Sequence, residues 1–371
     1  MSTADATPAE AAAPTDRRAE VAGGVSTLPD PRFGITAARR SLLAKIVLWG
    51  NLICQMGIIL TGGTVRVTGS GLGCSTWPNC EPGTFLPEFT PASGLHPLIE
   101  FGNRTLTGVL SIFAIAVLIV AWRWLRHYGP GFMKLAWVPL IGTGIQALLG
   151  AVVVWMDLHP GVVSPHFLVS PVIVALSTIL VVRMYEGPGQ RRLTVPSALL
   201  WLFIVFAAVG FIVMVLGTIV TGTGPHSGDS SDVYRIPMDP RMASWLHADA
   251  VMLFCGLLLG LVIALHALRA RRPAIIAAWA MVGLTLLQAV IGYSQYFLGL
   301  PEPLVLLHLL GAAMFAGGIT WVGTALFTWK PADADATVSV DTPVGVDPTT
   351  GSPTTVRPLP SSAPHDEGTL R

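Results

Sequence analysis

Residues 145–166 read IQALLGAVVVWMDLHPGVVSPH, and residues 287–308 read LQAVIGYSQYFLGLPEPLVLLH. In both stretches the final histidine follows the glutamine by 20 positions and the first glycine by 16. Two apolar segments, joined by a short turn and with a histidine just inside the second, therefore occur twice at one spacing, which indicates an internal duplication. A histidine kept at the same depth in apolar surroundings is the first indication of chemistry.

The composition places the chain in a lipid bilayer. The 371 residues are 52% hydrophobic and only 12% charged, with a mean hydropathy of +0.64, which is too apolar for a soluble protein of this length. The formal net charge of +1 gives no reason to expect a nucleic-acid partner. The two ends differ from the middle, because residues 1–40 and 331–371 are rich in Ala, Pro, Thr and Asp, and we predict disordered tails there.

Eight apolar segments between the tails approach the roughly 20 residues that a membrane-spanning helix needs. They lie at about 42–64, 99–122, 134–155, 163–183, 197–220, 245–267, 274–297 and 303–327.

Basic residues predict the orientation of these segments. They gather before the first segment and in every second connection after it, while the other connections hold only four arginines. The basic connections and both termini should therefore be cytoplasmic, as in a multi-pass protein of the plasma membrane. The four outward arginines are Arg66, Arg104, Arg235 and Arg241.

The duplication predicts the fold class. Eight helices divide into two sets of four, and an even number per set gives both copies the same orientation. We expect an all-α polytopic membrane protein with two pseudo-symmetric four-helix bundles, at residues 41–187 and 188–330.

Further similarities pair the polar residues of the two halves. GGTVRVTGSG at 62–71 resembles GTIVTGTG at 217–224, and the second helices of the two halves then begin with IEFGNR (99–104) and SWLHAD (244–249). We align these two stretches with a shift of one position, so that Asn103 matches His247. Each half then has one polar position on its second helix and one histidine, His166 or His308, on its fourth. All of these positions fall near the outward ends of their helices.

The two histidines of the second half suggest a bound haem. Neutral imidazole is the usual axial ligand of haem iron, and the core of a helix bundle is a common cofactor site. His247 and His308 therefore predict a bis-histidine haem b. In the alternative interpretation each histidine only satisfies a polar neighbour.

The first half suggests a reaction. Glu100 and Asn103 share a helix face, and Arg104 is placed to pair with Glu100. A carboxylate just inside a bilayer is costly unless it is paired or used, so the alternatives are an interfacial ion pair and a proton-handling group. If His166 ligates an iron with Asn103 opposite, the sixth position stays open for oxygen, as in an oxidising site.

The four cysteines fall into two pairs. Cys74 and Cys80 flank STWPN in the first outer loop, where an oxidising compartment and a short separation favour a disulfide. A free pair that acts as a redox relay is the alternative. Cys54 and Cys255 lie inside apolar helices and are interpreted as small hydrophobic residues.

A family resemblance follows from several stretches taken together. They are GGTVRVTGSGLGCSTWPNC, HPLIEFGNRTLTG, VVSPHFLVS, GTIVTGTGPHSGD, WLHAD and LVLLHLLGA. In their order and spacing they resemble the haem A synthase family, over about residues 45–327. The resemblance implies eight helices in two similar halves, a haem b in the second half and a haem O substrate site in the first.

The same resemblance implies an activity. Members convert haem O to haem A for terminal oxidases, by hydroxylating the C8 methyl twice and losing water to leave a formyl group. By resemblance, Glu100 is the catalytic residue, His166 holds the substrate iron, and His247 and His308 are the haem b ligands. Haem O synthase is then the expected upstream partner and a terminal oxidase the downstream one, with an unknown electron donor.

One departure from the family concerns Asn103. Many members have a histidine at this position, so a second histidine ligand for the substrate haem cannot be carried over. His96 could substitute, although Pro97 favours a loop position for it. Arg66, Arg104, Arg235 and Arg241 are candidates for haem propionates or for supporting the site.

Two other functions stay open from the sequence. A b-type cytochrome that carries electrons, or a quinol oxidoreductase, would need the same histidines. A repeat-built, proton-coupled transporter would use the histidines and Glu100 as a proton relay.

Overall fold

The computed structural model describes residues 37–330 except 89, 92 and 230–232. The predicted tails fall outside the described residues, apart from residues 37–40, which are already helical. The prediction of an all-α protein is confirmed, since nearly all of the ordered structure is helical.

Eight helices in the described part are long and apolar enough to cross a membrane, as predicted. Most of them have a proline in the first turn, where a missing N–H does no harm. The third span consists of two helices that meet at Trp137. The helices are α1 (Ala37–Val67), α2 (His96–Trp124), α3 (Pro130–Ala136), α4 (Val138–Trp155), α5 (Pro160–Glu186), α6 (Ser197–Thr223), α7 (Pro240–Ala267), α8 (Arg272–Phe297) and α9 (Glu302–Ala325).

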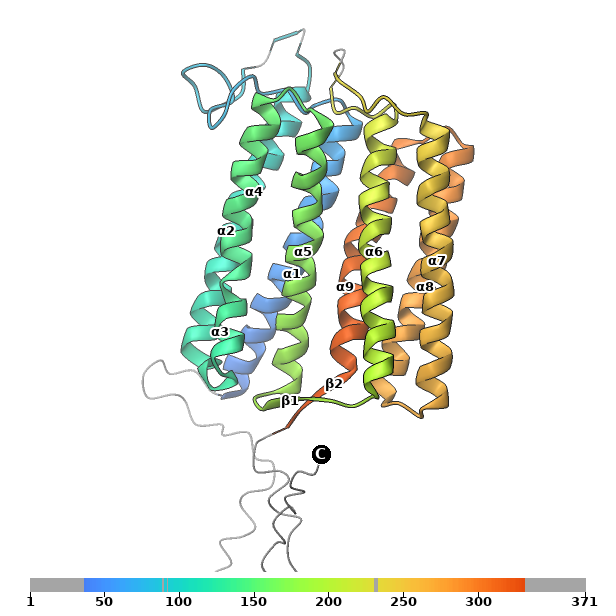
Figure 1. Cartoon of the computed structure of the whole chain (residues 1–371). Helices are drawn as coiled ribbons and strands as arrows, with labels where there is room; N and C mark the ends of the chain where they lie inside the picture. Colours follow the sequence, from blue (N-terminus) through green and yellow to red (C-terminus); the bar gives the residue numbers. More distant parts are fainter. Residues whose placement is uncertain (1–36, 89, 92, 230–232, 331–371) are drawn as a thin grey trace, which may run out of the picture.

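The helices lie side by side in two groups of the same packing order (Figure 1). In the first group α1 and α4 each contact both α2 and α5, so α2 and α5 stand diagonally opposite. In the second, α6 and α8 each contact both α7 and α9, which are again diagonal. The groups meet where α1 and α5 contact α9 and where α5 contacts α6. The division into domains at residues 187 and 188 stays a prediction, which this packing order supports.

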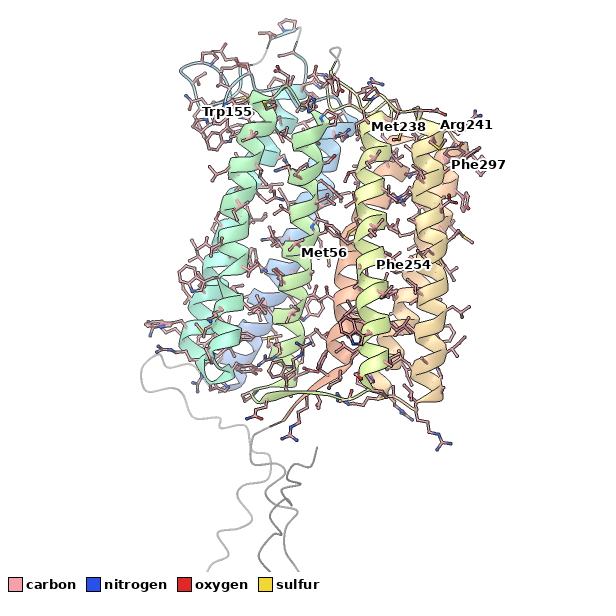
Figure 2. The ribbon with its side chains drawn as sticks, viewed as in Figure 1. Met56, Trp155, Met238, Arg241, Phe254 and Phe297 are labelled. Atoms are coloured by element: carbon pink, nitrogen blue, oxygen red, sulfur yellow. A yellow bond between two sulfur atoms is a disulfide. The ribbon has the colours of Figure 1, made fainter. Side chains whose placement is uncertain are left out.

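Buried apolar side chains concentrate away from the outer ends of both groups. The core of the second group contains Phe206, Phe254 and Phe315, whose neighbouring ring centres lie 4.5 and 4.8 Å apart. Phe254 lies well below Met238 and Arg241, which mark the outer end (Figure 2). Since apolar packing occupies the inner part of each group, the polar side chains of the outer part are left to build a site.

A short antiparallel sheet joins the two groups at the opposite, basic end. Strands β1 (Gln190–Leu193) and β2 (Phe327–Lys330) pair with Gln190 opposite Lys330. The apolar pattern predicts a last helix that extends to residue 327 and no strand after it. The structure differs because α9 ends at Ala325, and the aromatic residues that follow pack on arginines, with the Arg191 guanidinium 3.4 Å from the centre of the Phe327 ring.

Candidate functional site

The two histidines of the second group face each other across it. His247 on α7 and His308 on α9 both lie about two turns inside the outer end of their helices, and their ring centres are 6.5 Å apart with planes at 74°. The diagonal placement of α7 and α9 produces this pairing, because each ring points toward the centre of the bundle. The sequence predicted the depth of both residues, and the structure brings them together.

Each of the three candidate histidines packs against a glycine of a neighbouring helix. A Cβ built on Gly217 would lie 3.4 Å from the Cε1 atom of His247, and one on Gly292 would lie 3.5 Å from that of His308. The same arrangement recurs in the first group, where a Cβ built on Gly150 would lie 3.7 Å from the Cε1 atom of His166. A larger side chain at these positions would displace the rings. The spacing of Gly150 and Gly292 was noticed in the sequence, but their contact with the rings was not.

The ring nitrogens of the second group are available to a metal. His247 places Nδ1 3.0 Å from the carbonyl oxygen of Val213, and if Nδ1 donates there, Nε2 keeps a free lone pair. The Nδ1 atom of His308 is buried and has no hydrogen-bond partner among the described residues. A buried nitrogen without a partner is uncommon unless a ligand supplies one.

The distance between the rings fits one metal ion held between them. A metal–imidazole bond is about 2 Å, and the ring centre lies roughly 1 Å beyond the nitrogen, so the ring centres of two opposed ligands are about 6 Å apart. No three His, Cys, Asp or Glu side chains gather as a metal site in residues 37–330 as far as they are described. Two axial ligands are the number that a metal porphyrin requires from the protein.

The first group has a histidine and an amide on the corresponding diagonal helices. His166 on α5 has a buried Nδ1 atom without a hydrogen-bond partner in the described part, like His308. Asn103 on α2 accepts a hydrogen bond of 2.8 Å on Oδ1 from the hydroxyl of Thr61. Gln146 donates to the carbonyl of His166 at 2.9 Å, which fixes the backbone that carries the ring. The roles of Thr61 and Gln146 had not been predicted.

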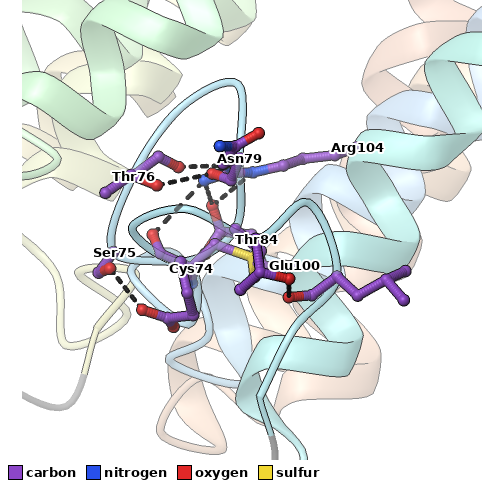
Figure 3. Close-up of a disulfide and its surroundings, with 10 residues drawn as sticks. Cys74, Ser75, Thr76, Asn79, Thr84, Glu100 and Arg104 are labelled. Carbon is purple, nitrogen blue, oxygen red and sulfur yellow. Dashed lines mark hydrogen bonds and ion pairs between the residues drawn. A yellow bond between two sulfur atoms is a disulfide. The ribbon is translucent and has the colours of Figure 1, made fainter.

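Glu100 lies buried below the first outer loop, with 5% of its surface exposed. Its Oε2 atom accepts the backbone N–H of Cys74 at 2.7 Å, and its Oε1 atom accepts from Arg104 Nε at 3.0 Å (Figure 3). Arg104 also donates to the carbonyl of Thr76 at 2.7 Å. The pairing with Arg104 was expected from the spacing, whereas a backbone donor from a loop leaves no signal in the sequence.

A disulfide closes the loop above Glu100. Cys74 and Cys80 are bonded, with their Cα atoms 4.4 Å apart, which is the arrangement that the sequence favoured over a free pair. The loop that they close, residues 74–80, supplies both the N–H on Glu100 and the carbonyls that bind Arg104 (Figure 3). Cys54 and Cys255 are free and half-buried.

The remaining candidates are used in different ways. Arg66 donates through Nε to the carbonyl of His226 at 2.8 Å and through Nη2 to that of Thr221 at 3.1 Å, so two of its nitrogens already join the outer ends of the two groups. Arg235 and Arg241 are exposed at the outer end. His96 is the first residue of α2 and lies 2.9 Å from the hydroxyl of Ser70, so the loop position expected for it was wrong, because Pro97 fits the first turn of a helix.

The sequence is similar to that of known proteins. The family model described as "Cytochrome oxidase assembly protein" matches residues 45–227, which include Glu100, Asn103 and His166 and end before His247.

Three curated relatives are all named "Heme A synthase". The relative from Bacillus pumilus is 35% identical over 147 residues, covering 38% of this chain and 45% of that protein. The relative from Listeria welshimeri is 34% identical over 139 residues, covering 37% and 44% of the two chains. The one from Bacillus cereus strain G9842 is 26% identical over 286 residues, covering 72% of this chain and 88% of that protein. The chain therefore spans less than half of the length of the two relatives that are more than 30% identical, and most of the length of the relative that is 26% identical.

Proposed function

The chain belongs to the haem A synthase family, and on that premise we propose that it converts haem O to haem A in the membrane. The reaction oxidises the C8 methyl of haem O to a formyl group by successive hydroxylations. The enzyme is a multi-pass membrane protein of cytochrome oxidase assembly. Haem O synthase supplies the substrate and a terminal oxidase receives the product, as the resemblance implies.

The observation that carries the proposal is the pair of facing histidines. His247 and His308, with ring centres 6.5 Å apart, are the residues that would hold haem b. When bound, haem b supplies one-electron transfer. Gly217 and Gly292 leave room for the two rings, and the carbonyl of Val213 orients one of them, so that both imidazoles are held ready for an axial role.

The first group provides the substrate site in this proposal. His166 binds the iron of haem O, supported by Gln146 on its carbonyl and by the packing of its ring against Gly150. Asn103, on the diagonal helix, replaces the second histidine of the other group. An amide is a weak ligand for haem iron, so the position opposite His166 stays open for oxygen.

Glu100 acts on the methyl group that is oxidised. The Cys74 N–H and the Arg104 guanidinium hold its carboxylate, and Oε2 carries only one of these hydrogen bonds. A second lone pair on Oε2 is therefore available to accept a proton or to stabilise positive charge at the reacting carbon. Burial under the loop of residues 74–80 keeps bulk water away from this carboxylate.

Basic side chains near the outer loops would hold the propionates of the haems. Arg235 and Arg241 are exposed there. Arg235 has one long hydrogen bond, from Nη2 to the carbonyl of Pro225 at 3.5 Å, whereas Arg66 has two nitrogens engaged by backbone carbonyls. Arg235 and Arg241 are therefore the better candidates to bind carboxylates. We infer that both termini are cytoplasmic, and the basic connections, which lie at the end of the molecule opposite this site, support this orientation.

The test is the haem content of the purified protein after coexpression with a haem O synthase. Haem is extracted and separated by chromatography, and we expect haem b together with haem O and haem A. Haem b alone would favour an electron-carrying b-type cytochrome, and a protein without haem would favour a transporter. Either result would overturn the synthase proposal.

A further inference from the structure

A pocket of about 400 Å³ lies between the outer ends of α5 and α6 and takes no part in the reaction described above. Its volume is in the range of small-molecule sites. Apolar side chains form most of its walls, among them Pro165, Leu168 and Ile219, and a few polar groups interrupt them. These polar groups are His159, Ser164, Thr218 and Tyr234.

Two of the polar residues form a flat, stacked surface. The rings of His159 and Tyr234 lie parallel, with centres 4.6 Å apart and planes at 13°. His159 precedes α5, and its Nδ1 atom accepts the backbone N–H of Gly161 at 3.1 Å. In the neutral ring the hydrogen is therefore on Nε2, which becomes a donor for a ligand. A ligand with a planar ring and an oxygen at its edge matches a stacked pair, an N–H and a hydroxyl in otherwise apolar walls.

The pocket stands between the two candidate haem sites. Thr218 lines the pocket, and its neighbour Gly217 faces the ring of His247 on another side of α6. On α5, Ser164 and Leu168 line the pocket, and each is two residues from His166. Successive helical residues are about 100° apart, so His166 projects from the opposite side of α5. One helix, about 10 Å thick, therefore separates the pocket from each histidine site.

We propose that this pocket binds a membrane hydroquinone that supplies electrons to the enzyme. The inference rests on the proposed function, because inserting one oxygen atom from O₂ into a methyl group requires two electrons and two protons. With Q for the quinone and R for the macrocycle, one hydroxylation is R–CH₃ + O₂ + QH₂ → R–CH₂OH + H₂O + Q. One oxygen atom of O₂ is inserted into a C–H bond of the methyl group. The other oxygen atom takes the two hydrogens and two electrons of the hydroquinone and becomes water, and the hydroquinone is oxidised to the quinone.

The residues of the pocket suit both forms of this ligand. The Nε2–H of His159 donates to an oxygen of the quinone or the hydroquinone, and the stacked rings cover its face. Tyr234 is 55% exposed, so its hydroxyl joins the ligand to the outer solvent, into which the two protons leave. The electrons cross α6 toward His247. A lipid acyl chain would use neither the N–H nor the stacked pair.

Two substitutions separate ligand binding from folding. His159→Asp keeps an acceptor that caps α5 but removes the ring and its donor, and Tyr234→Phe keeps the stack but removes the hydroxyl. His127→Asp is the matched control at the basic end, where His127 contacts the ring of Tyr128 at 4.8 Å. Tyr293→Phe, at an exposed tyrosine on α8 outside the pocket, is the control for Tyr234→Phe.

The experiment uses the purified holoenzyme in detergent, with duroquinol as the reductant and the haem b absorbance as the readout. We expect His159→Asp to raise the half-saturating duroquinol concentration about tenfold and Tyr234→Phe to raise it severalfold, since each loses one hydrogen bond or more. Both controls should leave it unchanged. An aryl-azide benzoquinone, irradiated with the protein, should label peptides that contain residues 159–168, 215–219 or 234–237.

Labelling at other peptides, or unchanged duroquinol dependence in both pocket variants, would overturn the inference. Labelling that is displaced by phospholipid but not by quinone would also overturn the inference, because the pocket would then be a lipid site. The proposed function fails separately. If haem A accumulates in cells while the pocket stays unlabelled, the synthase proposal holds and the hydroquinone site is wrong. If the pocket is labelled but the protein makes no haem A, the hydroquinone site holds and the synthase proposal is wrong.

Discussion

At the scale of single residues, the two halves differ in what stands opposite a histidine. His308 faces His247, whereas the position aligned with His247 in the first half is Asn103, which Thr61 holds by a hydrogen bond. The histidines have similar surroundings otherwise, since each ring packs on a glycine. In the proposed function, this difference between a histidine and an asparagine separates the site that carries electrons from the site of reaction.

Asn103→His should convert the substrate site into a copy of the other. We expect bound haem O to change from five-coordinate, high-spin iron to six-coordinate, low-spin iron, because imidazole is a much stronger axial ligand than an amide. Absorption and electron paramagnetic resonance spectra of the haem O-loaded protein measure this change. Low-spin haem O already present in the unsubstituted protein would show that another residue binds the iron, and His96→Ala would then test His96.

Glu100→Gln should abolish most of the conversion of haem O. General acid–base groups contribute about 10²–10⁴-fold to rate, so the yield of haem A should fall at least 100-fold while the haem b spectrum stays intact. Glu81→Gln, in the same outer loop and paired only with Ser75 in the described contacts, is the control. Unchanged turnover in Glu100→Gln would remove the catalytic role of this residue.

The matching depth of His166 and His308 could be predicted from the sequence because their spacing from a glutamine repeats. Gln146 and Gln288, and His166 and His308, stand at one spacing in both halves. Contacts that depend on loop backbone could not be predicted in this way. The N–H of Cys74 on Glu100 and the carbonyls of Thr76 and Asn79 near Arg104 come from residues whose side chains have no part in the contact.

At the scale of elements, the helices were predictable and their local interruptions were not. A run of about 20 apolar residues has few alternatives to a spanning helix, since every backbone group must be satisfied internally. The break at Trp137 and the pairing of β1 with β2 depend on local contacts, such as the Arg183 guanidinium above the ring of Trp329. Hydropathy does not encode these contacts.

The disulfide loop should stabilise the outer end. Closing a loop of about seven residues reduces the entropy of the unfolded chain by an amount worth roughly 2 kcal/mol, so Cys74→Ser with Cys80→Ser should lower the free energy of unfolding by about that much. Chemical unfolding in detergent measures the difference. Cys54→Ser with Cys255→Ser is the matched pair of free cysteines and should change much less. Equal stability of both double variants would contradict this role of the loop.

At the scale of the whole molecule, the two halves are joined at both ends. At the basic end β1 pairs with β2, and at the outer end Arg66 of α1 donates to carbonyls that follow or belong to α6. Gly71 donates to the carbonyl of Gly228 at 2.7 Å beside it. These links keep the outer loops of the two halves together above the site.

Arg66→Leu should loosen this connection. Hydrogen bonds to charged groups contribute about 1.5–3 kcal/mol each, so the loss of two should destabilise the protein by roughly 3–6 kcal/mol. Arg241→Leu, an exposed arginine at the same end, is the control and should have little effect. Thermal unfolding of the two variants in one detergent measures the difference. A smaller loss for Arg66 than for Arg241 would show that the carbonyl contacts contribute nothing.

The central claim is that one iron is bound between His247 and His308. The most direct measurement is the electron paramagnetic resonance spectrum of haem b in the purified protein and in His247→Ala and His308→Ala. We expect a low-spin bis-histidine signal in the unsubstituted protein and its loss in both variants. The signal of haem O bound at His166 should stay unchanged in both. A low-spin haem b signal that survives either substitution would contradict the account.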